Sequence, residues 1–273
     1  MEAQQPTPKK VRTSTLADFK RAGRKFSCLT SYDHLTAGIF DEAGIDVLLI
    51  GDSAADNALG HSSTLPITVD EMIPFGRAVS SAANRALVVI DMPFGSYEPS
   101  AEVALANGIR FLKESGAHAV KLEGGVRSSA QIRALVTAGI PVMGHIGFTP
   151  QSVNNLGGFK VQGRGEDAAV ELMAEAKAVE EAGAFAVVLE MVPAALAKQV
   201  SETLSIPTIG IGAGAGTDGQ ILVWTDFAGL SGQKTRKFVK RYANLRKELL
   251  AAAVAYRTEV ADGVFPAPEN EFD

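Results

Sequence analysis

The sequence predicts an α/β protein that folds as a single (β/α)8 TIM barrel. Short apolar runs rich in Val, Ile and Leu recur along the 273 residues, and longer Ala-, Glu- and Leu-rich stretches separate them. Runs that are apolar throughout, rather than alternating, are typical of parallel strands covered by helices on both faces. Eight such runs in about 250 residues match the barrel, whereas an open doubly wound sheet usually has fewer strands.

The elements follow from these patterns in chain order. The predicted strands are residues 26–30, 47–51, 86–91, 119–123, 141–145, 185–190, 208–212 and 221–225. Stretches long enough for crossover helices are residues 101–115, 128–138, 167–182 and 194–204. Several helices are expected to end at a glycine that can adopt the left-handed cap conformation, namely Gly44, Gly116, Gly139 and Gly183.

The two ends of the chain differ from this repeat. Residues 1–14 are rich in Pro, Gln and Lys, which predicts a flexible arm. Residues 15–263 form the predicted catalytic barrel, with residues 234–261 as its last outer helix because apolar positions recur there near helical spacing. Residues 264–273 contain two prolines and are expected to form an extended tail.

Composition disfavours several classes of protein. Twenty-six basic and 31 acidic residues give a net charge of −5 without a long run of either sign, so we expect neither a nucleic-acid nor a membrane partner. The single cysteine, Cys28, cannot form an internal disulfide and is expected in the core. The polar N-terminus does not resemble a secretory segment, and no apolar stretch reaches about 18 residues. We therefore expect a cytoplasmic protein.

Acidic residues close three consecutive apolar runs. In a TIM barrel the active site lies at the carboxyl ends of the strands, so Asp52, Asp91 and Glu123 are expected to converge there. Three adjacent carboxylates require bound protons or a cation. Oxygen donors without a Cys or His cluster favour Mg²⁺ over Zn²⁺. Alternatively, each aspartate caps the helix or turn that follows it.

Three further ionisable residues close the neighbouring runs. Lys121 shares a strand face with Glu123 and suits an anionic group of a substrate, although a structural Lys–Glu pair is the alternative. Glu190 follows an apolar run and is a candidate general base or an ordinary turn residue. His145 could bind substrate, orient a ligand or pack in the core.

Other motifs carry less information. The glycine-rich residues 210–216 fit either a phosphate cradle or a tight turn that packs closely. The sequence contains no Gly-x-Ser-x-Gly elbow, Walker loop or paired-histidine zinc motif. Hydrolase and NTPase functions are therefore disfavoured.

The chain resembles the ketopantoate hydroxymethyltransferase family from about residue 12 to its end. The matching segments are residues 29–33, 51–53, 63–66, 91–94, 120–125, 145–152 and 218–220. Two positions depart from the family pattern: Ser62 stands where relatives often have an acidic residue, and Ala215-Gly216 replaces a Pro or Asn that often follows the second glycine of Gly-Ala-Gly.

The resemblance implies a barrel of the phosphoenolpyruvate and 2-oxo acid binding type. It implies Mg²⁺ held by Asp52 and Asp91, with Glu123 acting directly or through water. The residues that would bind the substrate, 3-methyl-2-oxobutanoate, are Asp52, Ser53, Asp91, Lys121 and His145. Glu190 would take the proton from C3.

The implied reaction is the first committed step of pantothenate synthesis. The enolate would attack the methylene carbon of the co-substrate 5,10-methylenetetrahydrofolate and give 2-dehydropantoate and tetrahydrofolate. The family is homo-oligomeric, commonly a decamer, so we expect the same assembly here.

Two other functions compete with this hypothesis. The phosphoenolpyruvate mutase and isocitrate lyase group also binds 2-oxo acids on Mg²⁺, but its lyases use a cysteine in a Lys-Lys-Cys-Gly-His type segment that this sequence lacks. A barrel that only binds or scaffolds is the other alternative. It is disfavoured because such a protein has no need of five ionisable groups at one barrel mouth.

Overall fold

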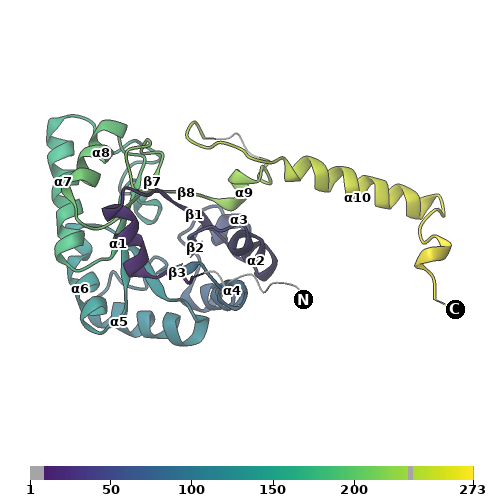
Figure 1. Cartoon of the computed structure of the whole chain (residues 1–273), viewed down its shortest axis with the longest axis horizontal. Coiled ribbons are helices and arrows are strands. Elements are labelled where there is room, and N and C mark those ends of the chain that lie inside the picture. The colour runs from purple at the N-terminus through teal and green to yellow at the C-terminus, as the bar shows by residue number, and fades with distance from the viewer. Residues whose placement is uncertain (1–8, 233–235, 273) are drawn as a thin grey trace. The chain divides into compact units, whose positions relative to one another are not determined.

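The chain folds around a closed barrel of eight parallel strands, which confirms the predicted fold class (Figure 1). The computed structural model describes residues 9–232 and 236–272. The strands follow one another around the barrel in sequence order, and β8 pairs with β1. They are β1 Phe26–Thr30, β2 Val47–Ile50, β3 Leu87–Asp91, β4 Ala119–Glu123, β5 Val142–Gly147, β6 Ala186–Glu190, β7 Thr208–Ile211 and β8 Gly219–Leu222.

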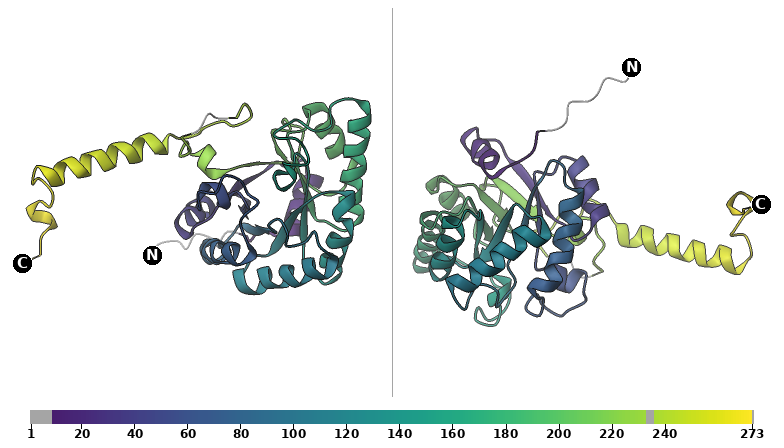
Figure 2. Two further views of the ribbon diagram at one scale, coloured as in Figure 1. Left: turned by 180° about the vertical axis from the view of Figure 1, so that it is seen from behind. Right: turned by 90° about the horizontal axis from the view of Figure 1, so that it is seen from below.

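Helices on the outside of the strands cover the barrel in all three views (Figures 1 and 2). The helices of this part of the chain are α1 Thr13–Arg21, α2 His34–Glu42, α3 Ala54–Asn57, α4 Val69–Ala82, α5 Ala101–Arg110, α6 Ser129–Thr137, α7 Glu166–Glu181 and α8 Ala194–Thr203, with short turns η1 Phe111–Ser115, η2 Val126–Ser128 and η3 Pro150–Ser152. The four predicted crossover helices are confirmed. The four predicted glycine stops all have positive φ, as a left-handed cap requires.

The strands are apolar along most of their length and carry polar residues at their carboxyl ends, which form the mouth of the barrel. Strands β2, β3, β4 and β6 are buried along their whole length, as their continuous apolar sequences predict. Strand register pairs the residues at the carboxyl ends: Asp91 with Lys121, Glu123 with His145, and Gly147 with Glu190. Because side chains alternate along a strand, these residues point to the same face of the sheet.

The last strand differs from its prediction. Strand β8 covers Gly219–Leu222, not residues 221–225, and no helix lies between β7 and β8. The side chain of Gln220 is exposed and donates hydrogen bonds to the Gly214 carbonyl and to Thr217 Oγ1. The β7–β8 loop thus folds against β8, whose outward positions need not be apolar, and the apolar-run rule fails there.

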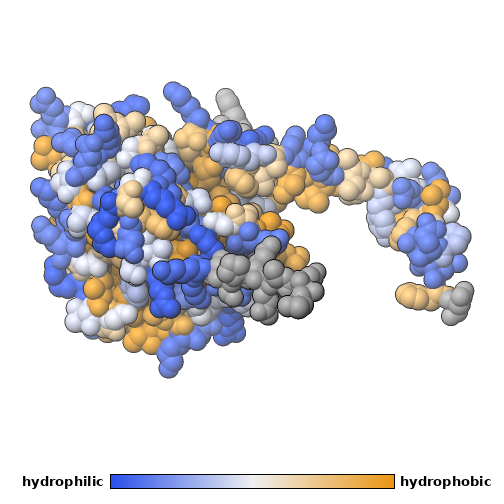
Figure 3. All heavy atoms as spheres, in the orientation of Figure 1, coloured by the Kyte–Doolittle hydropathy of each residue, from blue (hydrophilic) through white to orange (hydrophobic). Residues whose placement is uncertain are grey.

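The chain divides into two compact units between Val223 and Trp224. The second unit contains α9 Trp224–Phe227, α10 Leu245–Ala261 and η4 Pro268–Asn270. Helix α10 begins eleven residues after the predicted start at residue 234, and none of its residues is buried. Apolar side chains gather along it (Figure 3). That this helix completes a barrel domain over residues 15–263 stays a prediction.

The N-terminal segment is ordered earlier than predicted. Val11 is buried and its N–H donates to the Arg85 carbonyl, and α1 begins at Thr13. The predicted arm over residues 1–14 is therefore too long at its carboxyl end, and residues 1–8 lie outside the described part. Among the described helices, none is long and apolar enough to cross a membrane.

Candidate active site

Two aspartates and a lysine meet where β2, β3 and β4 end. Asp91, the last residue of β3, is buried and accepts a hydrogen bond from Lys121 Nζ on Oδ1 at 2.6 Å. Its Oδ2 accepts the backbone N–H of Asp52 at 3.0 Å. A Cβ at Gly51 would lie 2.8 Å from Ser53 Oγ, so glycine permits the tight turn that places Asp52 beside Asp91.

The charges of this cluster are not balanced by the protein. Burial, together with the negative charges of Asp91 and Glu123, raises the pKa of Asp52 to about 8. Burial alone would lower the pKa of Lys121, but Asp91 and the other carboxylates raise it above its ordinary value. Lys121 is therefore charged, and the carboxylates around it still favour an additional cation.

His145 lies between two carboxylates. Its Nδ1 is 3.4 Å from Glu123 Oε1, and its Nε2 is 3.4 Å from Glu190 Oε2. Burial and Lys121 oppose protonation of the ring, but Glu123 and Glu190 outweigh them and raise the pKa of His145 to about 9. Since both ring nitrogens face carboxylates, this geometry favours an orienting role over a hydrogen bond to substrate.

The backbone around Glu190 is unusual. A Cβ at Gly147 would lie 2.4 Å from the Glu190 carbonyl oxygen, and Gly147 has φ +88°. The next residue after Glu190, Met191, has φ 49°, which is a rare conformation for a non-glycine residue. Strained backbone often occurs beside reactive groups, and here it turns the chain sharply at the end of β6.

Ser53 and the glycine loop lie near the barrel mouth but have other partners. The Ser53 hydroxyl is 2.6 Å from the Tyr32 hydroxyl. In the glycine loop, a Cβ at Gly214 would lie 2.5 Å from Ala194 Cβ, and one at Gly216 would lie 2.7 Å from Lys198 Cβ. Close packing on α8 therefore accounts for these glycines, which favours the turn interpretation over a phosphate cradle.

The donor set fits Mg²⁺ better than an enclosing metal cage. Within residues 9–232 and 236–272, no three His, Cys, Asp or Glu side chains are grouped closely enough to enclose an ion. Lys121 holds Asp91, and His145 faces Glu123. Mg²⁺ is usually bound by one or two carboxylates with waters and substrate oxygens, and Asp52 beside Asp91 provides such a pair.

Comparison with known proteins identifies the family. Residues 10–268 match the family model described as ketopantoate hydroxymethyltransferase. The chain belongs to the ketopantoate hydroxymethyltransferase family. Two relatives named 3-methyl-2-oxobutanoate hydroxymethyltransferase are a Leifsonia xyli subsp. xyli protein, 61% identical over 98% of this chain and 96% of the relative, and a Mycobacterium tuberculosis protein, 62% identical over 96% and 93%.

Solved structures share the fold of this family member. Phosphonopyruvate hydrolase in complex with oxalate and Mg²⁺ aligns with a TM-score of 0.60 at 15% identity, covering 95% of this chain and 93% of that chain. 2,3-Dimethylmalate lyase, of the PEP mutase/isocitrate lyase superfamily, aligns with a TM-score of 0.59 at 18% identity, covering 95% and 91%. At these identities the likeness concerns the barrel fold alone.

The structure adds two uncharged residues to the site of this ketopantoate hydroxymethyltransferase family member. Both are buried: Gln151 donates a hydrogen bond to Asp52, and the Tyr97 hydroxyl donates to Gln151 and accepts the backbone N–H of Glu123. Sequence reasoning missed them because neither is ionisable near neutral pH and both lie on loops. The one signal was that Gln151 lies within residues 145–152, a segment that carries the family resemblance.

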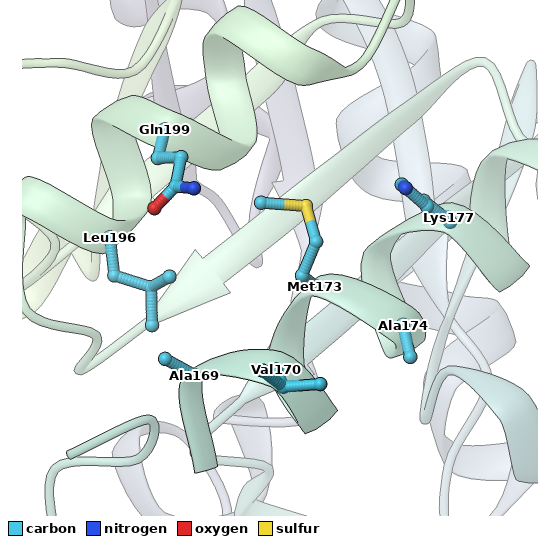
Figure 4. Close-up of a pocket in the computed structure, with 7 residues that line it drawn as sticks. All are labelled: Ala169, Val170, Met173, Ala174, Lys177, Leu196 and Gln199. Atoms are coloured by element: carbon cyan, nitrogen blue, oxygen red, sulfur yellow. The ribbon is translucent and has the colours of Figure 1, made fainter. Parts of the chain in front are cut away.

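A hollow on the outside of the barrel is not part of this site. It has a volume of about 340 Å³ and lies between α7 and α8 (Figure 4). Apolar side chains such as Val170 and Met173 of α7 and Leu196 of α8 line it, with Gln199 and Lys177 at its edge. None of the predicted site residues contributes to it.

Proposed function

We propose that this chain transfers a hydroxymethyl group from 5,10-methylenetetrahydrofolate to 3-methyl-2-oxobutanoate and yields 2-dehydropantoate and tetrahydrofolate. This is the first committed step of pantothenate synthesis. Family membership supports the proposal. The structural observation that carries it is a buried group of four carboxylates at the barrel mouth, in which Lys121 pairs with Asp91 and His145 faces Glu190.

Asp52 and Asp91 would hold Mg²⁺, and Glu123 would contribute directly or through water. When bound, the ion supplies Lewis-acid stabilisation of negative charge on the 2-oxo acid. The carboxylate pair is buried, so water does not screen its attraction for a cation.

The side chains of the chain do the remaining work. Lys121 and Ser53 bind the carboxylate of 3-methyl-2-oxobutanoate, which requires Ser53 to share its hydroxyl with Tyr32. Glu190 removes the proton from C3, and His145 holds the Glu190 carboxylate in place through its Nε2. The resulting carbanion at C3 attacks the methylene carbon of the folate, so that a C–C bond forms while one C–N bond breaks and the freed nitrogen takes up the proton that Glu190 removed. Water then replaces the second nitrogen on this carbon, which gives the hydroxymethyl group of 2-dehydropantoate and, with the remaining proton of the water on that nitrogen, tetrahydrofolate.

We also propose that the protein acts in the cytoplasm as a homo-oligomer, a decamer by family resemblance. Leu249, Leu250 and Val254 on α10 are 58%, 59% and 46% exposed. An exposed apolar helix face of this kind favours association with another chain. Sedimentation velocity tests the assembly: a ten-chain species is expected, and a monomer at micromolar concentration would contradict it.

The reaction is tested by incubating the protein with both substrates and Mg²⁺ and measuring 2-dehydropantoate. We expect turnover by the wild type and by Glu202→Gln, a control for loss of an exposed acid on α8, and loss of turnover in Asp91→Asn. Failure of the wild type to form product would contradict the proposal. Turnover of oxaloacetate instead would indicate a lyase-like activity, and binding without turnover would indicate a scaffold.

A further inference from the structure

Gln151 connects two acidic residues that lie on different strands. It lies in η3, in the loop after β5, and is 5% exposed. Its side-chain Nε2 donates to Asp52 Oδ2 at 3.0 Å and to the Met92 carbonyl at 3.0 Å. Its backbone N–H donates to Glu123 Oε2 at 3.0 Å. One uncharged residue therefore contacts carboxylates at the ends of β2 and β4.

Tyr97 and the Met92 carbonyl together determine which way the Gln151 amide faces. The Tyr97 hydroxyl is buried and donates to Gln151 Oε1 at 2.6 Å. The Tyr97 hydroxyl oxygen also accepts the backbone N–H of Glu123 at 3.2 Å. The Met92 carbonyl can only accept a hydrogen bond, so the Gln151 NH₂ group must face Met92 and Asp52, and the Gln151 carbonyl accepts the proton of the Tyr97 hydroxyl. The hydrogen bonds form a closed ring through Glu123, Tyr97 and Gln151.

We propose that Gln151 is a positioning residue that fixes the Asp52 and Glu123 carboxylates for a divalent cation, and that Tyr97 sets the direction of its amide. The inference rests on the proposed function, since it concerns the Mg²⁺ site of that reaction. Residues that hydrogen-bond metal ligands fix their orientation, and their loss commonly weakens metal affinity. The hydrogen bonds of Gln151 go to Asp52, Glu123, Met92 and Tyr97 and not to Glu190, so we infer that it acts on cation binding and not on proton removal.

Gln151→Met tests the side-chain bonds. Methionine keeps the length of the side chain and the backbone N–H, but it removes both the donor to Asp52 and the acceptor for Tyr97. Mn²⁺ replaces Mg²⁺ as the probe because both prefer oxygen ligands, and the electron paramagnetic resonance signal of free Mn²⁺ reports binding without any substrate. We expect the Mn²⁺ dissociation constant to rise about 10- to 100-fold.

Two further variants complete the test. Tyr97→Phe keeps the ring but releases the Gln151 amide, and we expect its Mn²⁺ dissociation constant to rise about 10-fold. Gln199→Met makes the same exchange on the outer face of α8, and we expect wild-type Mn²⁺ binding. In steady-state assays of Gln151→Met, the Mg²⁺ concentration for half-maximal rate should rise while kcat at saturating Mg²⁺ changes little.

The possible results separate the inference from the function. Wild-type Mn²⁺ affinity in folded Gln151→Met, or in Tyr97→Phe should Gln151→Met not fold, would overturn the inference and leave the proposed function standing. A merely structural role would lower the melting temperature without changing the Mn²⁺ affinity of the folded protein. Absence of Mn²⁺ binding by the wild type would instead contradict the metal requirement of the proposed function.

Discussion

Both ends of the barrel contain buried acidic residues, but only at one end do the protein's own donors and cations balance their negative charge. At the amino ends of the strands, both oxygens of Asp41 accept backbone N–H groups of residues 84–86, and Asp46 pairs with Arg85 at 2.6 Å. Asp218 pairs with Lys20 at 2.8 Å. These acids have the donors that they need, so this end of the barrel serves stability.

At the carboxyl ends the protein leaves negative charge in excess. Four carboxylates lie there with two cationic side chains, Lys121 and His145. Burial, together with the negative charges of Asp91 and Glu123, raises the pKa of Asp52. Both ends of the barrel contain buried acidic residues, so burial of an acid at a strand end does not by itself identify the active site. What distinguishes the active site is the excess of carboxylates over cationic side chains. This excess favours the binding of a cation, which can stabilise an anionic transition state.

The largest effect is expected on kcat when Glu190, the proposed base, is replaced. In Glu190→Gln the size and hydrogen-bonding capacity of the side chain remain, but the base is lost. We expect kcat to fall at least about 100-fold, while the affinity for 3-methyl-2-oxobutanoate, measured by calorimetry, stays near that of the wild type. A kcat close to the wild-type value would remove Glu190 from the mechanism.

A pair of variants compares the cations of the two ends. Lys121→Met and Arg85→Met each remove the cation nearest to a buried aspartate, and each should lower the free energy of unfolding by about 3 kcal/mol in EDTA. Because the mouth binds a cation, Mg²⁺ should restore part of the stability of Lys121→Met, measured by urea unfolding, and none of that of Arg85→Met. Equal responses to Mg²⁺ would contradict the comparison.

A second pair compares the acids themselves. The folded-state pKa of Asp52 is about 8, above its ordinary value, so the folded protein binds the proton more tightly and loses stability as pH rises toward that value. In EDTA, the free energy of unfolding of the wild type should fall between about pH 6 and pH 9. In Asp52→Asn this fall should be smaller by about 1 to 3 kcal/mol.

Asp46→Asn is the matched control at the other end. It weakens the bonds of Asp46 to Arg85 and to the Ser27 N–H, and it should lower the free energy of unfolding by about 2 kcal/mol at both pH values. Turnover should be that of the wild type. If the free energy of unfolding of Asp52→Asn depended on pH as that of the wild type does, the charge of Asp52 would not be the source of the excess negative charge.

Most of the barrel could be predicted from the sequence because its signals are local. Seven strands follow continuous apolar runs, and helices end at glycines that adopt the left-handed conformation. Strand β8 was misplaced because exposed Gln220 lies in it, and an apolar run marks a strand only when both faces are buried. The start of α10 differs from its prediction because residues 236–244 are rich in Lys and Arg, as helices often are, but do not form a helix.

The site divides in the same way. Asp52, Asp91, Lys121, Glu123 and Glu190 could be chosen from the sequence since ionisable residues at strand ends are conspicuous and the barrel places them together. The roles of Gln151 and Tyr97 depend on bonds between loops that are 54 residues apart. The position of His145 between two carboxylates depends on strand register, so sequence left its role open among three alternatives.

The most direct test of the charge imbalance is exchange of the C3 proton of 3-methyl-2-oxobutanoate in D₂O, followed by NMR without folate. We expect exchange by the wild type with Mg²⁺, a fall of at least about 100-fold in EDTA or in Asp91→Asn, and a rate within about twofold of the wild type in Asp46→Asn. Equal exchange with and without Mg²⁺, or none by the wild type under any condition, would contradict the account.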